Sequence, residues 1–245
     1  KAITCVGEED EVKIGGERFL EFTARCCKEG ILPENCYCVR LYRTTYEGER
    51  LVNTTQVNYV DPLDRKQILE ADQELRHQMN IITDFLRKYV PGYEHCTIKT
   101  GASTLGIRES RRFSGKYVMN ISDLREARRF PDVVVHKAQF VVDIHNPVGG
   151  GQANGIAEYV DAYDIPWRSL VPQKMENLIL AGRCISGTHE AMASYRVMAI
   201  AMAIGEAAGI GAALAIDHDV TPENLDVKYI QKALMDKGAV LFDEK

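Results

Sequence analysis

The stretch ENLILAGRCISGTHEAMASYRVMAIAMAIGEAAGIGAALA, residues 176–215, decides how the fold of this chain is interpreted. It opens with an apolar run, residues 178–181, that stops at Gly182 and Arg183. After a few polar residues comes a long segment built almost wholly from Ala, Ile, Met and Gly. This order predicts a buried strand followed by a long buried helix with little side-chain bulk, a junction common in α/β proteins.

The junction at Gly182 and Arg183 predicts a site for an anion or for a ring that carries negative charge. A helix start presents unpaired N–H groups and the positive end of the helix dipole, and both favour such ligands. Gly182 lets a ligand approach the backbone, and Arg183 offers a charged fork suited to phosphate. The alternative is a tightly packed core helix with a structural salt bridge at Arg183, and the residue pattern alone leaves both open.

Composition describes a soluble globular protein. The chain has 245 residues, of which 45% are hydrophobic and 27% charged, enough for one large domain or two small ones. Its net charge of -5 gives no general attraction to nucleic acid or anionic lipid. Arg196 and Glu206 interrupt the apolar segment, so we expect a core helix and no membrane span.

The seven cysteines are an odd number without a CxxC pair, which indicates reduced thiols and a cytoplasmic protein. Four of them (Cys26, Cys27, Cys36 and Cys38) raise the alternative of a thiol-ligated metal domain, but their spacing matches no zinc or iron–sulfur pattern, so no metal ligand is predicted. The chain begins at Lys1 without a signal peptide, and we expect it to be a piece of a longer protein.

Local patterns predict a mixed α+β fold. Expected helices cover residues 17–28, 65–90, 122–128 and 226–237, and expected strands cover residues 37–43, 51–60, 97–104, 107–117, 140–144 and 158–163. The glycine-rich residues 146–155 are the expected boundary between two regions.

Motifs in the same order along the chain resemble one family. They are YVPGYE (residues 89–94), LGIRESRRFSGKYVM (105–119), VVDIH (141–145), IPWRSLVP (165–172), the stretch at 176–215, and LDVKYIQKALMDKGAVL (225–241). Together they are similar to the C-terminal part of FAD-dependent oxidoreductases, in the broad flavoprotein class that includes fumarate reductase. The resemblance covers nearly all of the chain and is weakest before about residue 60.

The resemblance implies a substrate or cap region over residues 1–150 and the C-terminal part of an FAD-binding region over residues 151–245. Two departures from the family stand out. The sequence holds no GxGxxG turn in a strand–helix context, so we expect the N-terminal Rossmann portion to be missing and this fragment to lack FAD and activity. Glu206 stands where the family often has Gln, which predicts a buried charge that needs a partner.

The family resemblance also assigns cofactor contacts. It implies that Gly182 and Arg183 lie beside the ribityl–pyrophosphate chain of FAD. The backbone of Ser194, Tyr195 and Arg196, expected near a helix start, would face the N1/O2 edge of the flavin. A helix N-terminus there would stabilise the reduced flavin, which carries negative charge at that edge.

Three arginines in IRESRRFSG predict an anion clamp for a carboxylate substrate or for the cofactor. Alternation along a strand would place Arg108 and Arg112 on one face, and Arg111 with Glu109 on the other. The alternative is a structural strand whose arginines pair with Glu109 and Asp123.

Two histidines are candidate proton-transfer residues. Asp143 and His145 would share a face at a strand end, where a carboxylate can orient an imidazole. His189 follows the junction by a few residues. The alternative for each is a structural histidine.

These features predict a flavoenzyme fragment that transfers a hydride between flavin and a small, anionic organic substrate. A second copy of the chain, in a homo-oligomer, is a candidate partner. Two alternatives to a flavoenzyme fragment stay open. One is the thiol-ligated metal domain, and the other is a non-catalytic binding or assembly module that keeps the shape of the motif without the cofactor.

Overall fold

The computed structural model of the chain describes residues 13–145 and 157–243. Its helices are α1 (Phe19–Lys28), α2 (Arg65–Tyr89), α3 (Ile121–Arg125), α4 (His189–Tyr195), α5 (Met198–Asp217) and α6 (Val227–Asp236). Its strands are β1 (Lys13–Ile14), β2 (Glu17–Arg18), β3 (Arg40–Arg43), β4 (Arg50–Asn53), β5 (Val133–Ala138) and β6 (Tyr163–Pro166). The strands form antiparallel pairs, β1 with β2, β3 with β4, and β5 with β6, so the predicted mixed α+β class is confirmed.

The chain folds into two compact units. Unit 1 comprises Lys1–Ile107 and His145–Ile156, and unit 2 comprises Arg108–Ile144 and Ala157–Lys245. The predicted functional boundary at residue 150 falls among residues 146–156, outside the described part of the chain, and stays a prediction.

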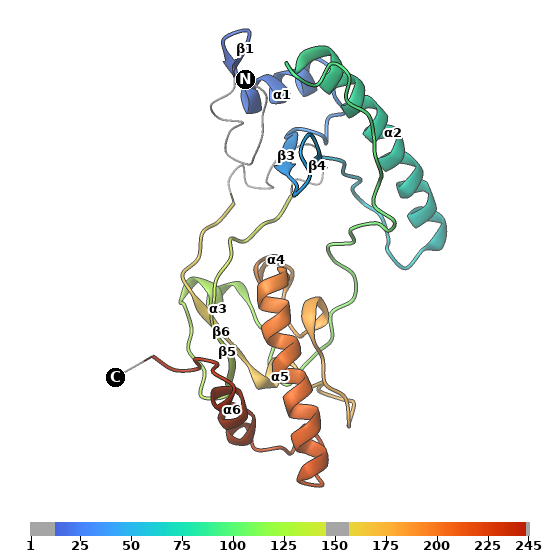
Figure 1. The fold of residues 1–245 in the computed structure, drawn as a ribbon. Coiled ribbons are helices and arrows are strands. Elements are labelled where there is room, and N and C mark those ends of the chain that lie inside the picture. The colour runs from blue at the N-terminus through green and yellow to red at the C-terminus, as the bar shows by residue number, and fades with distance from the viewer. Residues whose placement is uncertain (1–12, 146–156, 244–245) are drawn as a thin grey trace. The chain divides into compact units, whose positions relative to one another are not determined.

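In unit 1, helix α2 matches the helix predicted over residues 65–90. The Asp64 side chain caps its start by accepting from the backbone N–H groups of Lys66 and Gln67. It ends at Tyr89, just before Pro91, whose ring cannot continue a helix. Helices α1 and α2 supply most of one hydrophobic core, and both are seen in Figure 1. The buried members of this core are Phe19, Phe22, Cys26, Leu32, Cys36, Val39, Leu41, Ile82, Phe85, Leu86 and Val90.

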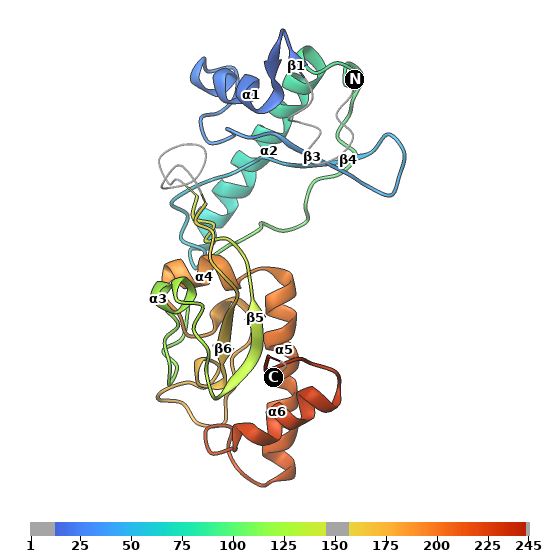
Figure 2. The same cartoon turned by 90° about the vertical axis from the view of Figure 1, so that its left-hand side faces the viewer.

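In unit 2, strand β5 pairs with β6 in a register broken by bulges, and α5 and α6 contact β5 and each other. Figure 2 shows the paired strands with these two helices. The last helix is close to its prediction, because Asp226 caps its start and Gly238, at φ +94°, follows its end. The core of this unit includes Trp167, the one tryptophan of the chain.

Several predicted strands are segments without a ladder. Residues 97–104 and 107–117 form no strand, and Gly115 makes only an isolated bridge to Pro172. Likewise, Val142 within residues 140–144 makes only an isolated bridge to Glu158. The apolar run at 178–181 is not a strand either, although it leads into a 3-10 turn at Gly182–Cys184. Apolar alternation therefore did not predict which segments pair as strands.

The predicted long helix after the junction is divided in two. Helix α4 ends at Tyr195, and α5 begins at Met198 after Val197, whose backbone is extended. The short helix expected at residues 122–128 is α3, and its cap is Asn120, which forms a capping box with Asp123.

Only one face of α5 is buried. Ile200, Ile204 and Ala207 face the core, whereas Met198 and Met202 are 83% and 75% exposed. Glu206, expected to be a buried charge, is exposed to water and needs no partner. By length and composition α5 is the one helix of the described residues that is apolar enough to cross a membrane, a property that it shares with core helices.

Candidate functional site

Two arginines from distant parts of the sequence meet at Asp143. Arg108 Nη1 lies 3.0 Å from Asp143 Oδ2, and Arg196 Nη2 lies 2.7 Å from the same oxygen. The same nitrogen of Arg196 also donates to the backbone carbonyl of Asp143, at 3.2 Å. Arg196 is largely buried, with 13% of its side chain exposed, whereas Arg108 is half-exposed. We call these three residues the Asp143 cluster.

The Asp143 cluster has a surplus of positive charge. Burial lowers the pKa of Arg196, and the charges of Arg108 and Arg183 lower it further, while Asp143 acts in the opposite direction. Arg183 therefore belongs to the same electrostatic neighbourhood. Two guanidinium groups on one carboxylate leave a net positive charge, which favours the approach of an oxyanion.

A second cluster joins Arg112, Glu109 and His189. Glu109 forms an ion pair with Arg112 through one oxygen, and its Oε2 lies 2.6 Å from Nδ1 of His189. Arg112 Nε donates to the carbonyl of Gly187 at 2.9 Å. The carboxylate can only accept, so with Glu109 ionised the proton of His189 lies on Nδ1, and Nε2 is the nitrogen available for proton exchange. A carboxylate-oriented, half-exposed histidine of this kind can serve as a general acid or base.

The structure pairs the arginines differently from the prediction by alternation. Residues 107–114 form no strand, so Arg108 and Arg112 do not share a strand face. Arg108 contacts Asp143 and Arg112 contacts Glu109. The structural alternative predicted that these arginines pair with Glu109 and Asp123. The pair with Glu109 forms, but Asp123 pairs with Arg128.

At the junction, Gly182 has φ +74°, and a Cβ at this position would meet no atom within 4 Å. A residue with a side chain would be strained there, and the open space leaves the backbone accessible to a ligand. Arg183 lies in the 3-10 turn that follows from Gly182. These two observations fit the predicted contact with a phosphate-bearing group.

Ser194 and Tyr195 are core residues of unit 2. The Ser194 hydroxyl donates to the carbonyl of Phe140 at 2.7 Å and is 2.8 Å from the hydroxyl of Tyr163. The Tyr195 hydroxyl donates to the carbonyl of Ile185 at 3.2 Å, and burial raises its pKa. Their side chains therefore hold the fold around the junction.

The backbone at residues 194–196 lies at the end of α4 and not at a helix start. The Arg196 N–H is bonded to the carbonyl of Met192, at 3.1 Å. The free N–H groups of a helix start belong instead to the first turn of α5, which begins at Met198. The helix start expected near residues 194–196 is therefore at Met198, and the flavin contact of residues 194–196 stays a prediction.

His145 is assigned to unit 1. Its Nδ1 lies 2.9 Å from the side-chain oxygen of Gln56, a residue of the same unit. Asp143, which was expected to orient His145, belongs to unit 2 and binds the two arginines.

The family model for FAD dependent oxidoreductases matches residues 8–234 of the chain. The chain belongs to the FAD dependent oxidoreductase family. No curated protein and no solved structure matches it. The match extends over both units, so the family accounts for unit 1 as well as for the junction in unit 2.

Residues of unit 2 fit the cofactor that the family implies. The open backbone at Gly182 and the surplus of guanidinium groups around Asp143 suit the phosphate groups of FAD. Sequence reasoning named Asp143 only as a partner of His145 and Glu109 only as a structural partner of arginine, and it missed their contacts with Arg108, Arg196 and His189. One signal for these contacts was present in the sequence. The motif VVDIH contains one carboxylate, and the other matched motifs contain several arginines that need a partner.

Burial disfavours the thiolate form of several cysteines of unit 1. Burial raises the pKa of Cys27 to about 12 and that of Cys36 to about 11. Metal binding and nucleophilic chemistry need the thiolate. Among the described residues, no group of three His, Cys, Asp or Glu side chains has the arrangement of a metal site.

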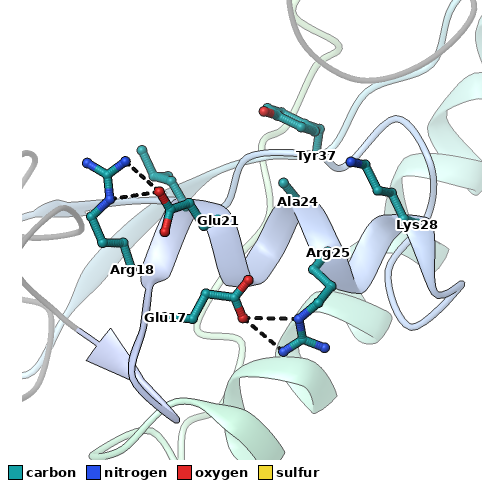
Figure 3. A pocket seen from close by; sticks show the side chains of 8 residues that line it. Glu17, Arg18, Glu21, Ala24, Arg25, Lys28 and Tyr37 are labelled. Atoms are coloured by element: carbon teal, nitrogen blue, oxygen red, sulfur yellow. Dashed lines mark hydrogen bonds and ion pairs between the residues drawn. The ribbon is translucent and has the colours of Figure 1, made fainter.

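A surface hollow of unit 1 is built around α1 (Figure 3). Arg18 pairs with Glu21 and Arg25 pairs with Glu17, so its charges are largely compensated. Lys28 and Tyr37 also line it. None of the predicted site residues borders this hollow.

Proposed function

We propose that this chain is part of an enzyme that transfers a hydride between FAD and a small, anionic organic substrate. The single observation that carries the proposal is the family match over residues 8–234, which makes flavin redox chemistry the activity to expect. FAD, when bound, supplies the atom that accepts or donates the hydride. The chain's own residues must bind and orient the cofactor and the substrate, and move a proton.

The two clusters of unit 2 suggest how these tasks are divided. Gly182 and Arg183 would contact the phosphate side of the cofactor, as the open backbone and the nearby positive charge support. Arg108 and Arg112 would act on the substrate. Because Arg108 pairs with Asp143 and Arg112 pairs with Glu109, the two arginines would have separate roles. His189 is the stronger candidate for proton transfer because Glu109 fixes its tautomer, and His145 is the second candidate.

We further propose that another part of the same polypeptide, upstream of this chain, binds the adenosine half of FAD. The support is the absence of a GxGxxG turn in the sequence, since that turn and its helix start normally hold the pyrophosphate. On this basis the chain alone retains no stoichiometric FAD and is inactive. Its reduced cysteines support a cytoplasmic location, and a homo-oligomer is compatible with its exposed apolar residues.

The test uses Arg183→Ala in a protein extended upstream to include the complete cofactor site. Loss of one charge-assisted contact weakens binding by roughly 1.5–3 kcal/mol, or about ten- to a hundredfold in affinity. FAD titration should show this loss while the melting temperature stays unchanged. Arg125→Ala is the matched control, because Arg125 is an exposed arginine of the same unit that pairs with Glu158.

Two results would contradict the proposal. An extended wild-type protein that binds no flavin would favour a non-catalytic module. A variant Arg183→Ala with unchanged FAD affinity and a lower melting temperature would make Arg183 a structural residue.

A further inference from the structure

We propose that Arg108 and Arg196 bind one oxyanion between them, and that Asp143 is the positioning residue that holds the two guanidinium groups together. The ligand class is a carboxylate or a phosphate. This deepens the proposed function and rests on it for the source of the anion, which is either the substrate or the cofactor. The binding of an oxyanion as such needs no flavin.

The first argument comes from the unused donors of the two arginines. A guanidinium group carries five N–H donors on three nitrogens. Arg108 contacts Asp143 only through Nη1, and Arg196 contacts it only through Nη2. Within residues 13–145 and 157–243, Nε and Nη2 of Arg108 and Nε and Nη1 of Arg196 have no hydrogen-bond partner. Arg108 therefore keeps the Nε–Nη2 edge that binds oxyanions in a bidentate manner, and Arg196 keeps single donors on Nε and Nη1.

The second argument is geometric. Both guanidinium groups converge on a single oxygen, Asp143 Oδ2, at 3.0 Å and 2.7 Å. Two like charges at such close range repel each other, and the shared carboxylate offsets that repulsion. Asp143 also accepts from Arg196 through its backbone carbonyl, so the position of Arg196 is fixed by side chain and main chain together.

The third argument concerns the supports of the site. Arg196 directly follows α4, whose start is capped by the Thr188 side chain and whose interior faces are buried. Asp143 follows Val142, which is bridged to Glu158 by a backbone hydrogen bond of 2.8 Å. Arg196 is largely buried. A bound oxyanion would offset the net positive charge that Arg108 and Arg196 leave around the single carboxylate of Asp143.

The experiment measures binding of inorganic phosphate and of succinate to this chain by isothermal titration calorimetry at constant ionic strength. We expect one site, weakened about tenfold or more in Arg108→Gln and in Arg196→Gln, because each loses a charge-assisted contact. Arg125→Gln, which removes an arginine from the ion pair with Glu158, should bind as the wild type does. Tighter binding of phosphate indicates the cofactor as the source, and tighter binding of succinate indicates the substrate.

Asp143→Asn tests the positioning role separately. This variant keeps the shape of the side chain but removes the charge that holds the two arginines together. We expect the preference of this variant for phosphate over chloride to fall, because the two guanidinium groups are no longer held together. The fall is expected although the net positive charge of the cluster is higher in the variant. A merely structural Asp143 would lower the melting temperature and leave this preference unchanged.

Clear results would overturn the inference. These are binding of neither probe to the wild type, equal losses in Arg125→Gln and Arg196→Gln, or an unchanged preference in Asp143→Asn. Arg196→Lys, which keeps the charge, serves if Arg196→Gln fails to fold, and it should still weaken binding, because one ammonium cannot reproduce the separate Nε and Nη1 donors. None of these outcomes depends on flavin, so they are distinct from a failure of the Arg183 titration.

Discussion

The same substitution, glycine to alanine, should have opposite effects at two positions of helix α5. A Cβ on Gly211 would lie 3.0 Å from Cζ3 and 3.2 Å from Cζ2 of Trp167, and closer still to Cη2. A Cβ on Gly209 would meet nothing within 4 Å. Both changes gain the same helix propensity, about 0.5–1 kcal/mol. Only Gly211→Ala also forces a buried, rigid ring to move, at a cost of about 1–3 kcal/mol.

Because the gain in propensity is common to both variants, their difference in the free energy of unfolding equals the packing cost. We therefore expect Gly209→Ala to be more stable than wild type and to exceed Gly211→Ala by about 1–3 kcal/mol. With a urea m-value of about 2 kcal/mol/M, the midpoints should differ by roughly 0.5–1.5 M. Trp167 is the one tryptophan of the chain, so its fluorescence reports the unfolding of unit 2. Equal midpoints, or a more stable Gly211→Ala, would refute the packing of α5 against Trp167.

Three further changes test other parts of the two units. Tyr163→Phe removes the hydroxyl that lies 2.8 Å from Ser194 Oγ, and should cost about 1 kcal/mol in urea unfolding. Asp164→Asn removes the buried carboxylate that lies 2.9 Å from Nδ1 of His136, and should cost about 1–3 kcal/mol by the same measurement. Burial raises the pKa of Cys27 to about 12, above its unfolded value of about 8.5. The folded state thus keeps a proton that the unfolded state loses, so the stability of unit 1 should fall as pH rises from about 8.5 toward 12, and Cys27→Ala should reduce that fall.

Local signals predicted the helices well and the sheet poorly. Helix α2 has a cap at Asp64 and a stop at Pro91, so both of its ends could be read from the sequence. The segment at residues 107–117 forms no strand, but the N–H of Phe113 donates to the carbonyl of Cys184 and the N–H of Lys116 donates to that of Val171. Such pairing depends on which segments meet in space, and alternation along one segment carries no information about that.

The candidate site shows the same limit. The family motifs identified Arg108 and Arg196, but not that both contact Asp143, which is 35 residues from one and 53 from the other. Alternation instead suggested a partnership with Arg112, which requires a regular strand that does not form. The break between α4 and α5 was also invisible, because neither Gly nor Pro marks Arg196 or Val197.

The path of the chain through unit 2 has a consequence for how the protein can be divided. Strand β5 belongs to the segment Arg108–Ile144 and its partner β6 to the segment Ala157–Lys245. Two polypeptides separated between these segments would each carry one strand of the pair and part of the core. Assembly of unit 2 would then become a second-order reaction between halves, with a rate that depends on their concentration. The same pair of halves would therefore work as a complementation reporter, in which formation of the Asp143 cluster signals that the two polypeptides have met.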